Sequence, residues 1–135
     1  MSRSNYSEDL DNWAMIKWRG QVTSAIRGKR GQTLLRELAE AMDAMQEKEL
    51  IASELEADGA HCALGAVGAK RGIDMSSLDP TDSMSVAAAF DVANALACEI
   101  VYINDEEGPY CGETDAERWT RVRAWVSEQI TKGPL

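Results

Sequence analysis

Apolar residues recur every three or four positions along several stretches of the chain, a spacing that predicts α-helices. The clearest stretch runs from Gln32 to Met45, where charged side chains occupy the face opposite the apolar one. The apolar stripe consists of Leu34, Leu35, Leu38, Ala41, Met42 and Met45. This segment is therefore predicted to be an amphipathic helix.

A similar stripe precedes it, from about Asp11 to Arg27, with Asp11 placed to cap the start. Its inward positions are Met15, Trp18, Val22, Ala25 and Ile26. Gly20 lies in the middle and costs about 1 kcal/mol relative to alanine, which suggests either close packing against a neighbour or a local break. Between the two helices, Gly28-Lys29-Arg30-Gly31 is predicted to be a connection.

Later helices are indicated mainly by their end signals. A short Ala/Gly-rich helix is expected from His61 to Arg71, closed by a left-handed Gly72. Asp79-Pro80-Thr81-Asp82 is a typical helix start, with Asp79 as the cap and Pro80 at the first position. Another helix is expected from about Val92 to Ile103. A last helix begins at Thr114, where Glu117 completes a capping-box pattern, and buries Trp119, Val122, Val126 and Ile130.

The segment between residues 46 and 60 is less regular. Leu50-Ile51-Ala52 suits either a short strand or a helical turn, and Asp58-Gly59 is a turn signal. The predicted fold class is mostly α: a compact bundle of five or six short helices, with room for a minor two-stranded β element. Residues 1–135 are expected to form one globular domain, in which 1–10 are a flexible arm.

Charge is distributed unevenly over the chain, which carries a net −9. Residues 1–32 hold six bases against three acids, a local +3, whereas the rest holds eight bases against twenty acids, a local −12. An acidic body disfavours non-specific binding to nucleic acid or an anionic membrane, because phosphate binding relies on Lys and Arg. A signal-like apolar N-terminus is absent and the three cysteines are odd in number and widely spaced, so we expect a cytoplasmic protein.

Residues with metal or catalytic potential do not form a recognisable motif. His61, Cys62, Cys98 and Cys111 lack the close ligand pairs of structural zinc sites, and the acidic clusters lack the spacing of a calcium loop. Gly65-Ala66-Val67-Gly68 resembles a fragment of a dinucleotide-binding loop but is better explained by tight helix packing. We therefore predict no metal, no cofactor and no enzymatic activity, with a site near His61 and Cys62 as the weaker alternative.

Residues 86–103 echo a helix-turn-helix, with Ala87, Val92 and Ile100 at the expected apolar positions. Asp91 replaces the usual turn glycine, and the second helix contains no Lys or Arg. Because base-reading helices normally need positive charge nearby, a simple helical corner is the preferred interpretation.

Two surfaces could bind a macromolecule. Glu54, Glu56 and Asp58 would suit a protein partner with a basic surface. The alternative is a nucleic-acid contact through a basic N-terminal patch, consisting of Lys17, Arg19, Arg27, Lys29 and Arg30. The same bases could instead pair with the protein's own acids or complement the C-terminus of their helix, and we favour this structural interpretation over nucleic-acid binding.

Several short motifs, taken in order, resemble those of a family of small phage and prophage proteins. They are Gly28-Lys29-Arg30-Gly31-Gln32, then Asp58-Gly59 with Cys62-Ala63-Leu64-Gly65, then Ile103-Asn104-Asp105. Members often show a doubled cysteine before the Leu-Gly, and Ala63 takes the second place here. The resemblance implies a phage setting in the host bacterial cytoplasm rather than a mechanism. The expected function is a non-enzymatic accessory protein that modulates or inhibits a host or phage partner, a host defence complex being one example.

Overall fold

The structure, a computed structural model, describes residues 3–4, 12–106, 108 and 112–131. It confirms the mostly-α fold class with a minor two-stranded element. The helices of the described residues are α1 (Asn12–Arg27), α2 (Lys29–Ala44), α3 (Ala63–Arg71), α4 (Ser83–Phe90), α5 (Asn94–Asp105) and α6 (Asp115–Thr131), with a 3₁₀ turn, η1, at Met75–Ser77. Strands β1 (Glu56–Ala57) and β2 (Ala60–His61) form an antiparallel hairpin.

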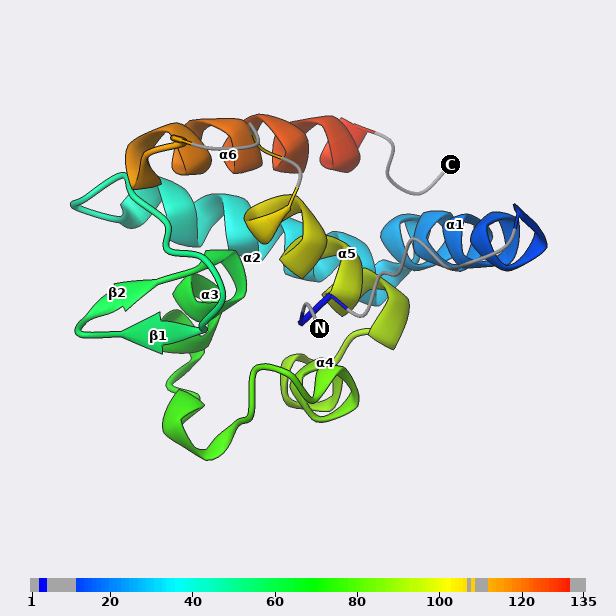
Figure 1. Cartoon of the computed structure of the whole chain (residues 1–135), viewed down its shortest axis with the longest axis horizontal. Helices are drawn as coiled ribbons and strands as arrows, with labels where there is room; N and C mark the ends of the chain where they lie inside the picture. Colours follow the sequence, from blue (N-terminus) through cyan, green and yellow to red (C-terminus); the bar gives the residue numbers. More distant parts are fainter. Residues whose placement is uncertain (1–2, 5–11, 107, 109–111, 132–135) are drawn as a thin grey trace.

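Helices α2 and α5 organise the core. Helix α2 packs against α1, α3 and α6, and α5 packs against α1, α3, α4 and α6 (Figure 1). The predicted α2 stripe is confirmed, since Leu34, Leu35, Leu38, Ala41 and Met42 are all buried. On α6 the predicted inward positions Val122 and Val126 are fully buried, and Trp119 and Ile130 pack against the same core.

The corner between α1 and α2 is tighter than the sequence suggests. Only Gly28 separates the two helices, so the prediction of a four-residue connection was wrong: Lys29, Arg30 and Gly31 form the first turn of α2. At Gly31, a Cβ atom would lie 1.9 Å from the carbonyl oxygen of Ala25. Only glycine permits this approach, and the approach lets α2 begin directly after α1.

Gly20 behaves differently from both expectations. Helix α1 is continuous through it, and no heavy atom outside its own helix backbone lies within 4 Å of where its Cβ would be. It therefore marks neither close packing within the chain nor a break. The first half of α1 extends beyond the other helices (Figure 1), which also explains why Met15 is 38% exposed rather than buried as predicted.

The segment after α2 holds the hairpin. Leu50-Ile51-Ala52 forms neither a strand nor a helical turn, although Leu50 is buried and the Ile51 amide donates to the His61 carbonyl. The predicted Asp58-Gly59 turn is confirmed: it joins β1 to β2, with φ of 52° at Asp58 and 83° at Gly59. Positive φ at both central residues is the requirement of a type I′ hairpin turn.

Helices α4 and α5 form the expected corner, bent by 105°. The start of α4 was predicted three residues too early. Asp82, not Asp79, caps α4 by accepting from the Ser85 amide, while Asp79 accepts from the Thr81 amide in a turn of its own. Asp91 closes α4 in the left-handed region with φ of 55°, the position where a glycine is usual.

Two further end signals are confirmed, although α3 begins at Ala63 and not at the predicted His61, which belongs to β2. Thr114 and Glu117 form the reciprocal capping box before α6, with N–H···O distances of 3.0 and 3.1 Å. Gly72 ends α3 with φ of 75°. The small residues of α3 serve packing, as expected, because a Cβ at Gly65 would lie 1.9 Å from the Leu55 carbonyl oxygen.

Of the expected N-terminal arm, only Arg3 and Ser4 belong to the described residues. Both are buried, and Arg3 binds Asp105 at the end of α5 through two hydrogen bonds of 2.6 and 2.8 Å. The rest of the arm, and the proposed Asp11 cap, lie outside the described residues.

Candidate functional site

The three predicted acidic residues lie on or beside the hairpin and are exposed. Glu54 precedes β1, Glu56 lies on it, and Asp58 occupies the turn. Of the three, only Glu56 has an ionic neighbour in the described chain, His61, at 3.4 Å. The hairpin thus presents these carboxylates on a short, hydrogen-bonded scaffold.

Two further carboxylates join them from the loop after α2. Glu47 and Glu49 are exposed and line a shallow pocket of about 410 Å³ together with Asp58 and His61. We call the five residues Glu47, Glu49, Glu54, Glu56 and Asp58 the acidic end. The sequence shows the two groups of acids separately, but it gives no signal that the loop and the hairpin meet.

Little positive charge offsets the acidic end. Within the described part of the chain, Glu47, Glu49, Glu54 and Asp58 form no ion pair. The nearest base in sequence, Lys48, donates instead to the carbonyls of Met42, Asp43 and Met45 at the end of α2 and lies over the ring of Trp119. These acids therefore keep their negative charge directed to solvent.

The predicted basic patch is divided between two sides of α1. Arg19 and Arg27 line one groove, where Arg19 binds the buried Glu99 through two hydrogen bonds of 2.8 and 2.9 Å. Lys17, Lys29 and Arg30 line another groove, where α1, α2 and the start of α5 meet. The structure does not bring the five bases together as one surface.

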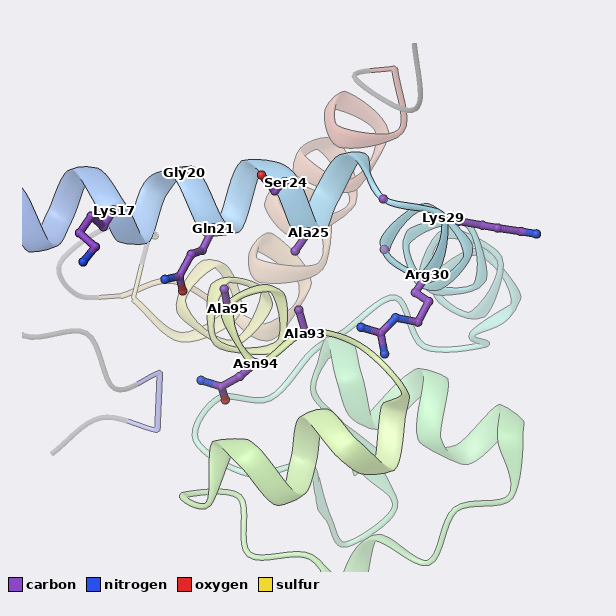
Figure 2. A pocket seen from close by; sticks show the side chains of 12 residues that line it. Lys17, Gly20, Gln21, Ser24, Ala25, Lys29, Arg30, Ala93, Asn94 and Ala95 are labelled. Atoms are coloured by element: carbon purple, nitrogen blue, oxygen red, sulfur yellow. The ribbon is translucent and has the colours of Figure 1, made fainter.

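The groove that holds Lys17, Lys29 and Arg30 is the larger of the two, with a volume of about 1050 Å³; we call it the basic groove. Figure 2 shows Lys17, Gln21, Asn94 and Arg30 reaching its space from three helices, while Lys29 directs its ammonium group away. Arg30 lies 3.2 Å from Asp91 in an exposed ion pair. Gln21, Ser24 and Asn94 also line the groove, and the sequence assigned none of these three to a binding site.

Two helix starts also line the basic groove. The first residues of α2 and of α5 belong to its wall, and neither helix has a side-chain cap. The N-terminus of a helix carries partial positive charge on amides that lack partners within the helix. The two helix starts therefore add positive potential to that of the two lysines and one arginine that line the groove.

The residues with catalytic or metal-binding potential do not form one site, because each of them contacts different partners. The Cys62 thiol is buried, accepts from the Gly65 amide at 3.4 Å and from Arg3 at 3.7 Å, and so caps α3. His61 faces Glu56 rather than the thiol, and Cys98 is buried in α5. Among the described residues no three His, Cys, Asp or Glu side chains gather as a metal site would require, and Cys111 lies outside those residues.

Residues 86–103, which resemble a helix-turn-helix in sequence, form a helical corner. The second helix of this corner, α5, is not exposed as a DNA-recognition helix would be. The residues of α5 from Ala95 to Val101 are buried beneath neighbouring helices. A recognition helix must lay its side chains against base edges. Helix α5 is instead a core helix.

No single helix among the described residues is long and apolar enough to cross a bilayer; α4 and α5 reach that threshold only when counted together across their bend. Comparisons with protein-family models, with curated proteins and with solved structures give no match.

Proposed function

We propose that the protein is a phage-type accessory protein, a non-enzymatic binding module that acts in the bacterial host cytoplasm. Its acidic end binds a basic surface on a macromolecular partner and modulates that partner. The observation that supports this proposal is the set of exposed carboxylates at Glu47, Glu49, Glu54 and Asp58, which form no ion pair with the described residues and lie on or next to a hydrogen-bonded hairpin.

Charge complementarity explains how such a surface would act. Concentrated negative charge speeds diffusional encounter with a basic face and disfavours partners of the same sign. A partner that handles nucleic acid offers a basic face, and an acidic domain placed there excludes phosphate from it. Inhibition of a host defence complex would be one form of this occlusion.

Binding of nucleic acid through the predicted basic patch is the weaker candidate. Arg19 is already paired with the buried Glu99, and Arg27 and Lys17 line different grooves. Phosphate binding gains from several cations along one path. The chain's net charge of −9 opposes it further.

The test compares the wild type with a neutralised variant, E54Q/E56Q/D58N. Asn-Gly is favoured in a type I′ turn, so Asp58→Asn preserves the hairpin. A control variant, A116K/T120K/A124K, makes the same change of three charges on an exposed face of α6. Tagged forms of all three are used to capture partners from bacterial lysate, and partners are quantified by mass spectrometry.

We expect one or more proteins with a basic surface that the wild type and the control capture and the neutralised variant loses. The purified pair should then associate more slowly as salt rises. Equal capture by the neutralised variant would refute the role of the acidic end. A gel shift with DNA or RNA at physiological salt, abolished by K17A/R27A/K29A/R30A, would favour the nucleic-acid alternative instead.

A further inference from the structure

The basic groove lies at the opposite end of α2 from the acidic end and has a floor of small residues. Gly20 and Ala25 of α1, Gly28 and Gly31 at the corner, and Ala93 and Ala95 at the start of α5 line it. Small side chains let another backbone approach closely, as they do where helices pack tightly. The shape of the groove therefore suits a segment of polypeptide lying across α1 and α5.

The charges around this floor favour an acidic occupant. Lys17 and Arg30 reach the groove from opposite ends, and the starts of α2 and α5 add partial positive charge between them (Figure 2). Within the described chain Lys17 forms no ion pair, and Asp91 is the acid that pairs with Arg30. Carboxylates placed here would meet a lysine, an arginine and two helix starts without side-chain caps.

An apolar surface continues the groove along α1. Trp13 is 69% exposed and lies four residues before Lys17, one helical turn along the same face. Ile16 is 63% exposed and lies between Trp13 and Gly20 at helical spacing. An occupant that contacts Lys17 can therefore bury both apolar side chains with its own.

Gly20 supplies an observation that the fold itself does not explain. Glycine costs about 1 kcal/mol relative to alanine inside a helix, and elsewhere in this chain Gly31 and Gly65 are required by backbone contacts. Around Gly20 there is no such contact within 4 Å. A chain docked in the groove would meet this bare segment of α1.

We propose that the basic groove binds an acidic amphipathic helix of a partner protein. Apolar residues of that helix cover Trp13, Ile16 and the floor around Gly20, and its carboxylates face Lys17, Arg30 and the starts of α2 and α5. A helix is preferred over a nucleic acid because the floor is apolar and the cations are few. The basic groove shares no residue with the acidic end.

The probe is a fluorescein-labelled amphipathic peptide of about five helical turns, with leucine on one face and glutamate on the other. Its controls are the same peptide with lysine for glutamate and a labelled single-stranded oligothymidine. Binding is measured by fluorescence anisotropy. We expect the wild type to bind the glutamate peptide, to bind neither control, and to lose affinity as salt rises.

Two variants of the full chain locate the site. Gly20→Leu adds a side chain at the groove wall, where the first added carbon meets open space, and replaces glycine by a better helix former, so its thermal midpoint should not fall. We expect it to weaken peptide binding by more than about tenfold. Lys17→Glu should weaken binding, whereas Arg36→Glu, an equal charge change on an exposed part of α2 outside the groove, should leave it unchanged.

Other outcomes overturn the proposal. Absence of binding to the glutamate peptide, or equal binding by Gly20→Leu and the wild type, means that the groove is not a docking site for such a helix. Equal binding of the lysine peptide would show that the groove does not select an acidic occupant. Binding of oligothymidine that Gly20→Leu abolishes assigns the groove to nucleic acid instead. The neutralised E54Q/E56Q/D58N variant should bind the probe like the wild type, which separates this site from the acidic end.

Discussion

Arg3 is a guanidinium that is only 5% exposed, although it stands near the start of a charged N-terminal segment. Burial by itself would lower its pKa and raise that of Asp105. The hydrogen bonds and charge that the two groups share outweigh burial, so the pKa of Arg3 lies above, and that of Asp105 below, its ordinary value. Asp105 also accepts from the Ser53 amide at 3.1 Å, so this one pair joins the N-terminal segment, the base of the hairpin and the end of α5.

Replacing Arg3 by alanine should destabilise the fold by about 3 kcal/mol, because it leaves the largely buried Asp105 carboxylate without its counterion. The measurement is a urea unfolding curve at neutral pH. Arg30→Ala is the comparison: it breaks the exposed pair with Asp91 and should cost about 1 kcal/mol or less. Equal midpoints for the two variants would show that the buried pair contributes nothing beyond a surface one.

At the scale of helices, Gly20 and Gly31 both lie within helices, but of the two only Gly31 has a backbone atom close to where its Cβ would be. Gly20→Ala should raise the free energy of unfolding by about 1 kcal/mol, since alanine favours a helix and meets open space there. Gly31→Ala should lower the free energy of unfolding by about 1–3 kcal/mol, because the added methyl group would clash with the Ala25 carbonyl oxygen and push α1 away from α2. Thermal and urea unfolding of the two single variants measure both signs.

Helices whose position depends mainly on neighbouring residues were predictable from sequence. The stripe of α2 and the capping box of α6 are properties of neighbouring residues, and both are confirmed. The predicted start of α4 was wrong because Asp79 and Asp82 can each accept a hydrogen bond from an amide two or three residues ahead. Sequence alone does not show which of the two competing turns begins the helix.

The candidate sites show the same division. The turn that presents Asp58 is a two-residue signal, so one part of the acidic end was accessible from sequence. The basic groove was not, because its walls come from residues 17–31 and 93–95, and their meeting depends on how α1 crosses α5. Nothing in the sequence distinguishes Lys17 and Arg30, which line the groove, from Arg19, which pairs with Glu99.

For the whole molecule, arginine–carboxylate pairs between elements make stability dependent on pH. Hydrogen bonds from Arg71, Arg123 and Arg121 hold the pKa of Glu37, Asp43 and Glu113, respectively, below the ordinary carboxyl range, as Arg3 does for Asp105 despite its burial. On acidification the unfolded chain binds protons first. The stabilisation is therefore present above the unfolded carboxyl pKa of about 4 and lost as pH falls through the lower folded values.

Urea midpoints should accordingly stay nearly constant from about pH 7 to pH 5 and drop below about pH 4. Glu113→Gln, which removes a carboxylate that accepts from Arg121 at 2.7 and 3.0 Å, should lower the midpoint at neutral pH and flatten the acid fall. A midpoint that is the same at neutral pH and at pH about 3 would contradict the linkage.

Helix α2 also has a consequence for the choice of partner. Its sixteen residues span about 24 Å, with the basic groove at the first turn and the acidic end beyond the last. Because the helix is buried along one whole face, this separation is a fixed length rather than a flexible tether. For a binding partner with an acidic helix and a basic patch spaced to match, the second contact becomes intramolecular once the first has formed, so the overall affinity rises without any gain in either contact alone. A partner with the same two features at another spacing could form only one of the two contacts, so the length of α2 would determine which partners bind through both.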